Sequence, residues 1–138
     1  MSLLRSSPGG YAMTGWPLLA GVTAGFCIGP VLPGLAGLAW VQAMGPERLG
    51  DSFLHLGTWG MLLLLTPLVS WPFWALTGIG SALLMQRSAY GALAAVAVGA
   101  ALGGATGALV GQPLLAPLGA ILATFHRFTL ALLRPLAF

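Results

Sequence analysis

Residues 91–111, GALAAVAVGAALGGATGALVG, hold a small residue at every fourth position and no charged side chain. The row comprises Gly91, Ala95, Gly99, Gly103, Gly107 and Gly111. Residues four apart share one face of an α-helix, and small side chains there let a second helix backbone come very close. The stretch therefore predicts a membrane-spanning helix with one face adapted to close helix packing.

A shorter row of the same kind, Gly21, Gly25 and Gly29, lies in the first apolar part of the chain. The two rows can pair within one subunit, or each can contact a copy of itself. We expect packing of this kind, within the subunit or within an oligomer, rather than a glycine-lined conduit.

The composition of the chain points to the membrane. Of its 138 residues, 58% are hydrophobic and 5% are charged, and its mean hydropathy is +0.96. Soluble domains carry about a quarter charged residues. Most of this protein's surface must therefore face lipid or other protein, which predicts an all-α integral membrane protein.

The polar residues divide the chain into four apolar blocks, over residues 16–44, 53–85, 89–110 and 114–133. One crossing needs about 20 residues, and very short connections make neighbouring helices antiparallel. We predict a compact antiparallel bundle of about four transmembrane helices in a single domain, 16–134. Short tails, 1–15 and 135–138, flank it.

The second block leaves the number of spans open. It has about 33 residues, or about 50 Å as a straight helix, which is long for one crossing. Pro67 and Pro72 lie in its middle, as Pro30 and Pro33 do in the first block. We expect one kinked helix, because nothing near the break is charged; the alternative is a hairpin over 53–86 and five spans.

The first block and the arginines bear on orientation. The block has about 29 residues against about 7–15 for the apolar part of a signal peptide, so we expect it to stay uncleaved. With four spans, most arginines lie on the side of both termini, which the positive-inside rule places in the cytoplasm. Abundant Ala, Gly, Arg and Pro without Lys or Asn indicate a GC-rich, bacterial genome, hence the bacterial inner membrane.

Both acidic residues and one histidine form a candidate cluster of polar side chains in a loop, called here the loop cluster. Glu47, Asp51 and His55 are spaced at i, i+4 and i+8. Adjacent members of a helical series can share a metal ion or a proton. Gly50 weakens a helix here, so we interpret the cluster as an ordinary solvated loop and predict no metal site.

His126 and Arg127 lie within the fourth block. Ionisable residues inside a span suggest a function, here contact with a ligand, a lipid phosphate or a partner subunit. The interpretation we favour is plainer: Arg127 extends to the lipid headgroups and His126 is interfacial, because Phe125 and Phe128 beside them suit that position.

Several function classes are disfavoured. A haem held by His55 and His126 is not expected, because the two histidines lie at different depths with four spans. No Asp, Glu or Lys lies inside a span, which argues against proton-coupled transport. With one cysteine and no catalytic motif we predict no cofactor and no enzyme, and the scattered arginines predict no nucleic-acid binding.

No motif identifies a family. We therefore expect a structural, accessory or assembly component of a membrane complex or homo-oligomer, whose partners are the lipid bilayer and a membrane-protein subunit or a second copy. The alternative is a small oligomeric channel or uniporter for a neutral or anionic solute, with proline-kinked helices lining it and His126 or Arg127 supplying charge.

Overall fold

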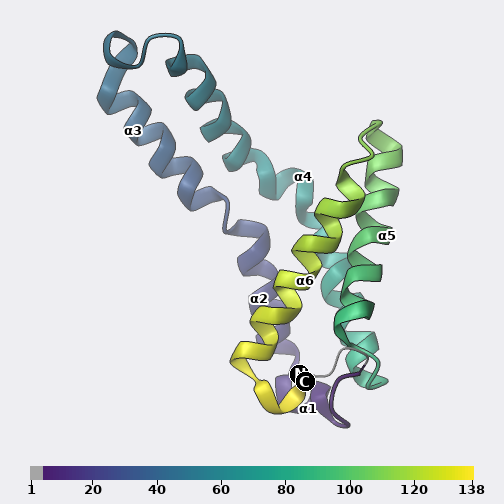
Figure 1. The fold of residues 1–138 in the computed structure, drawn as a ribbon. Helices are drawn as coiled ribbons and strands as arrows, with labels where there is room; N and C mark the ends of the chain where they lie inside the picture. The colour runs from purple at the N-terminus through teal and green to yellow at the C-terminus, as the bar shows by residue number, and fades with distance from the viewer. Residues whose placement is uncertain (1–4) are drawn as a thin grey trace. The chain divides into compact units, whose positions relative to one another are not determined.

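The computed structural model describes residues 5–138, and all regular elements in this range are helical (Figure 1). They are α1 (Gly10–Thr14), α2 (Trp16–Ile28), α3 (Val31–Leu49), α4 (Ser52–Gln86), α5 (Ala92–Val110), α6 (Leu115–Leu133) and the 3₁₀ helix η1 (Pro135–Ala137). In the described range, 4 helical stretches are long and apolar enough to cross a membrane: Trp16–Leu49, Ser52–Gln86, Ala92–Val110 and Leu115–Leu133. The prediction of an all-α membrane protein with four spans is confirmed.

The second span is a single helix. α4 continues through Pro67 and Pro72, so the hairpin alternative over 53–86 is wrong. A proline removes one backbone donor, but no charged residue lies near Pro67 or Pro72 to form a polar loop in place of the helix. An uninterrupted helix therefore satisfies more backbone groups in lipid than a turn at this point would.

The first span is broken into α2 and α3 at residues 29–30. Pro30 directly precedes α3, and Pro33 lies in the first turn of α3, where the missing N–H has no helical partner in any case. Pro30 thus causes the break, whereas Pro33 lies within α3 without interrupting the helix. A second irregularity occurs at Gly45, whose φ of 70° and ψ of 167° are non-helical and precede Pro46.

The chain divides into two compact units. Of the described residues, the first unit comprises 5–24 and 73–138, and the second comprises Gly25–Pro72. In the second unit α3 and α4 approach closely at Gly34 and Gly60. A Cβ atom on Gly34 would lie 3.0 Å from the Gly60 carbonyl oxygen, and one on Gly60 would lie 2.7 Å from Leu38 Cγ. Neither glycine belongs to the rows singled out from the sequence.

In the first unit, α5 and α6 form an antiparallel hairpin (Figure 1). A Cβ atom on Gly103 would collide with the Leu115 carbonyl oxygen, and one on Gly107 would lie 2.5 Å from the Gln112 carbonyl oxygen. A Cβ on Gly99 would likewise collide with the backbone of Gly119. The small-residue face of α5 is therefore covered by α6 of the same chain.

The remaining members of the two rows have other roles. Gly91 is the extended N-cap of α5, and Gly111 is its left-handed C-cap with φ of 69°. Gly21 and Gly25 are exposed on α2, and a Cβ on either would meet no described atom within 4 Å. Gly21 and Gly25 are thus open, whereas Gly29 lies just after α2 and a Cβ on it would lie 2.8 Å from the Gly25 carbonyl oxygen.

The two ends of the described chain are joined in the first unit. The Ser7 amide donates to the Ala137 carbonyl oxygen at 3.0 Å, and a Cβ on Gly10 would lie 2.6 Å from that same oxygen. Ala137 is 0% exposed. We call Ser7–Thr14 together with residues 135–138 the terminal clasp; only glycine fits at its contact point.

Candidate functional site

Buried polar side chains gather inside the first unit. They come from three spans and from the connection between α4 and α5. The set, called here the polar cluster, comprises Thr23 of α2, Trp74, Thr77 and Ser81 of α4, Tyr90, and His126 and Arg127 of α6. Lipid cannot hydrogen-bond such groups, so their partners must come from the protein or from something bound within it.

His126 occupies the part of the polar cluster beside α2. Its side chain is 0% exposed, and its Nε2 lies 2.9 Å from Thr23 Oγ1. The Thr23 hydroxyl already donates its one proton to the Leu19 carbonyl oxygen at 2.8 Å. Therefore Nε2 of His126 is the donor to Thr23 and carries a proton. The imidazole also lies against Trp74, with ring centroids 6.2 Å apart.

Arg127 occupies the part nearest the terminal clasp. The side chain is 4% exposed. Its Nε donates to the Tyr90 carbonyl oxygen at 3.4 Å, and its guanidinium carbon lies 5.1 Å from the centroid of the Phe138 ring, a cation–π arrangement. Phe138 also packs against the Tyr90 ring, with centroids 6.1 Å apart. Arg127 thus brings a positive charge into the protein under the clasp.

His126 and Arg127 lie inside the protein, so neither side chain points outward to lipid as the favoured interpretation expected. The interfacial depth of the two residues stays a prediction. Phe125 and Phe128 are exposed at 58% and 47%, but the two residues between them are buried. The reason is helical phase: His126 and Arg127 share the inward face of α6 with Ala123 and Leu130, both 0% exposed. Phe125 and Phe128, which flank this pair in the sequence, point to the opposite side of α6.

Three hydroxyls of the polar cluster are buried without a hydrogen-bond partner among the described residues. They belong to Thr77 and Ser81, both 0% exposed, and to Tyr90, 1% exposed. A buried hydroxyl left unpaired costs about 1–3 kcal/mol. Native proteins normally avoid such a cost, so unpaired hydroxyls mark places where water or a ligand binds.

Electrostatics connect Ser81, Tyr90 and Arg127. Burial raises the pKa of Tyr90 above its ordinary value of 10.0, while the Ser81 hydroxyl and the Arg127 charge each act to lower it. No contact between the two hydroxyls meets hydrogen-bond geometry. The phenol of Tyr90 therefore stays protonated at neutral pH.

The loop cluster of two acidic residues and a histidine that the sequence singled out lies elsewhere. Glu47, Asp51 and His55 are exposed, in α3, the following turn and α4. Within residues 5–138 no group of three or more His, Cys, Asp or Glu side chains is placed to hold a metal ion. These side chains form no buried site.

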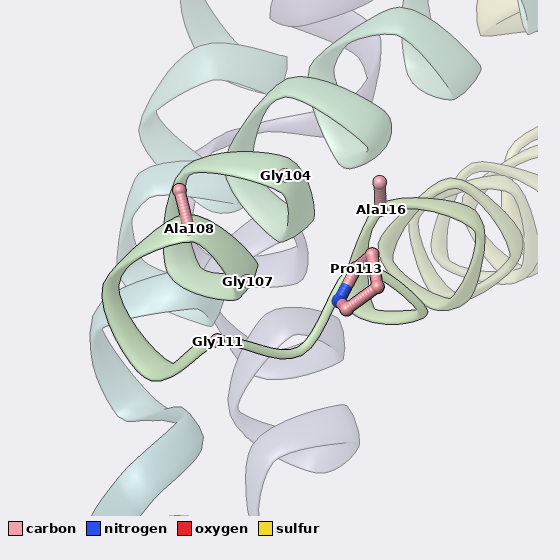
Figure 2. Close-up of a pocket in the computed structure, with 6 residues that line it drawn as sticks. All are labelled: Gly104, Gly107, Ala108, Gly111, Pro113 and Ala116. Atoms are coloured by element: carbon pink, nitrogen blue, oxygen red, sulfur yellow. The ribbon is translucent and has the colours of Figure 1, made fainter.

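A shallow apolar groove lies at the turn between α5 and α6 (Figure 2). Its volume is about 490 Å³, and it is lined by Gly104, Gly107, Ala108, Gly111, Pro113 and Ala116. No titratable or hydrogen-bonding side chain lines it. The groove therefore has no side chain that could hydrogen-bond or carry a charge to a ligand, and the polar cluster is the better candidate site.

Sequence reasoning missed Thr77, Ser81 and Tyr90, although a signal was present. Trp74, Thr77 and Ser81 are spaced at i, i+3 and i+7 in an otherwise apolar helix, which places them on one face. Hydroxyl residues are common in membrane helices, so a single Thr or Ser does not by itself indicate a binding site. Their shared face is what distinguishes them.

No family model, curated protein or solved structure matches this chain.

Proposed function

We propose that the protein is a structural or assembly component of a membrane complex or homo-oligomer, residing in the bacterial inner membrane with both termini in the cytoplasm. The observation that carries the proposal is the difference between the two glycine rows. The row on α5 is covered by α6, whereas Gly21 and Gly25 on α2 are exposed with no described atom within 4 Å of an added Cβ.

An open row of this kind favours contact with another helix. Glycine within a helix costs about 0.5–1 kcal/mol relative to alanine. Packing inside the chain offsets that cost on α5 but not on α2. In lipid, the surface of a small-residue row allows a second backbone to approach closely and gain dispersion contacts. A partner helix, from another protein or a second copy, supplies these contacts.

The proposed orientation rests on arginine positions. Exposed Arg5, Arg87 and Arg134 all belong to the first unit, before α2, after α4 and after α6. The connectivity puts these points at one end of the unit, since α5 and α6 are antiparallel and the terminal clasp joins both chain ends. Arginine-rich ends face the cytoplasm.

The test replaces the open glycines by leucine in native membranes. Gly21→Leu and Gly25→Leu should shift the protein from a larger complex to a smaller species on native gels, because the added side chains hold a second helix away. Gly57→Leu is the matched control, since a Cβ on Gly57 also meets no described atom but lies outside the row. Equal migration of all variants and wild type would refute the proposal.

A second candidate function, an oligomeric channel or uniporter for a neutral or anionic solute, is favoured by the burial of Arg127. It predicts anion flux into liposomes that falls strongly in Arg127→Ala. Liposomes that hold the wild-type protein but show no flux above empty ones would remove this candidate.

A further inference from the structure

We propose that the terminal clasp is a releasable cover over Arg127, which opens about the two glycines that flank α1. Opening moves the guanidinium from the inside of the first unit to its surface. The clasp thus controls whether this positive charge is buried or accessible. The device needs neither the open glycines of α2 nor conduction, so it is independent of both functions proposed above.

The position of Arg127 under the clasp is the first support. The side chain is 4% exposed, and its guanidinium carbon lies 5.1 Å from the centroid of the Phe138 ring. Leu133 is the last residue of α6, so Arg127 lies only about 9 Å along the helix from its end. A long basic side chain so near a helix end normally extends to water or headgroups. Arg127 stays inside because Phe138, as part of the clasp, lies over it.

The two connections of α1 are the second support. Gly9 precedes α1 with φ of 76°, and Gly15 follows it with φ of 72°. Both angles lie in the left-handed region, which glycine adopts without a steric cost. Hinges are a few residues at the ends of elements that absorb a change in φ and ψ. The short α1 between these glycines can therefore swing as one piece while α2 stays in place.

A small contact point fastens the clasp. The Ser7 amide donates to the Ala137 carbonyl oxygen at 3.0 Å, and a Cβ on Gly10 would lie 2.6 Å from that same oxygen. Ala12, on the outer side of α1, is exposed. The clasp is therefore a single layer at the surface of the first unit, and loss of the contact at Ala137 separates α1 from η1.

Closure of the clasp has a cost in hydrogen bonding. The hydroxyls of Ser6 and Thr14 are buried without a hydrogen-bond partner among the described residues. Opening hydrates these hydroxyls and the Arg127 charge, which favours the open position. The cation–π contact with Phe138 and the bond from Ser7 favour the closed position. The two positions thus have opposing stabilising effects, as a switch between two states requires.

The test uses the arginine-specific reagent p-hydroxyphenylglyoxal on the full-length protein in dodecyl maltoside. Peptide mass spectrometry gives the modification rate at Arg127, with exposed Arg87 as the internal reference. Phe138→Ala removes the ring from the guanidinium, and Gly10→Ala places a Cβ against the Ala137 carbonyl oxygen. Wild-type Arg127 should react slowly, and each variant should raise its rate relative to Arg87 by about fivefold or more.

Matched controls separate the cover from a general loosening of the fold. Leu136→Ala truncates an 81% exposed residue of the clasp, and Ala12→Val enlarges an exposed residue of α1. Both should leave the modification rate at Arg127 as in wild type. Amide exchange in residues 99–107, where α5 packs on α6, should be unchanged in all variants. Phe138→Ala, which only removes atoms, decides if the other clasp variant loosens this hairpin.

Opening of the clasp in the wild type is measured by amide exchange. The Ser7 amide should exchange about tenfold or more faster than the amides of residues 99–107, because the clasp opens without unfolding of the helices. Equal rates would overturn the proposal, since the clasp would then open only with the whole unit. Arg127 reacting in wild type as fast as Arg87, or no faster in Phe138→Ala than in wild type, would overturn it as well.

Discussion

Two adjacent glycines of α5 should respond in opposite ways to the same substitution. A Cβ on Gly103 would collide with the Leu115 carbonyl oxygen and would lie 3.2 Å from Ala116 Cα. A Cβ on Gly104 would meet only the Ala116 Cβ, at an ordinary 3.6 Å. Gly103→Ala therefore forces α5 and α6 apart, whereas Gly104→Ala adds a normal contact.

The magnitudes follow from two opposing effects. Replacing glycine by alanine in a helix gains about 0.5–1 kcal/mol of conformational free energy. At residue 103, overpacking against rigid backbone costs about 1–3 kcal/mol, and separating the helices also weakens contacts along the hairpin. We expect Gly103→Ala to lower the free energy of unfolding by about 1–2 kcal/mol, and Gly104→Ala to raise it by about 0.5 kcal/mol.

The assay is reversible unfolding in mixed micelles, titrated with a denaturing detergent and followed by far-ultraviolet circular dichroism. Wild type and both variants are measured under one set of conditions, so that uncertainties in extrapolation largely cancel. If Gly103→Ala is as stable as Gly104→Ala, the described contact between α5 and α6 is incorrect and this reasoning fails.

Three further substitutions test the first unit by the same unfolding assay. Thr23→Val leaves His126 Nε2 without its acceptor at 2.9 Å, so the free energy of unfolding should fall by about 1–3 kcal/mol; an unchanged value would contradict that bond. Gly111→Ala should cost about 1–2 kcal/mol, because φ is 69° and only strain is added in open space; a neutral result would mean that α5 ends differently. Burial raises the pKa of Tyr90 above 10.0, so its stabilising contribution is present below pH 10 and is lost as pH rises from there towards the folded-state pKa. Tyr90→Phe should flatten this alkaline loss, and an identical pH profile would show that Tyr90 is not responsible.

The span count was predictable because it depends on local composition. Apolar blocks separated by a few polar residues define the crossings, and the absence of charge around Pro67 and Pro72 favoured one helix, as α4 shows. The break at Pro30 was harder to place, since Pro33 has the same local chemistry. Their difference is position: Pro33 falls in the first turn of α3, where its missing donor has no effect.

The fate of each glycine row was not predictable from its spacing. Gly103 and Gly25 have the same local pattern, but the short turn after Gly111 returns α6 directly onto α5. Nothing described covers Gly25. Close packing of Gly34 and Gly60 was likewise invisible, because two isolated glycines on different helices form no pattern along the chain.

The candidate site was partly predictable. His126 and Arg127 stood out as ionisable residues inside an apolar block, but their direction depends on the phase of α6 against its neighbours. Thr77 and Ser81 are notable only because their shared face of α4 is buried, which the sequence alone does not show. Whether a residue belongs to a buried cluster depends on tertiary packing, which the residue type and its neighbours in sequence do not reveal.

The most direct test of the proposed assembly function is native mass spectrometry of the tagged protein, purified from its own host in mild detergent. The account predicts a defined stoichiometric complex, either with a foreign membrane protein or of identical copies, which dissociates in Gly25→Leu but not in Gly57→Leu. A monomer carrying only lipid and detergent would contradict it.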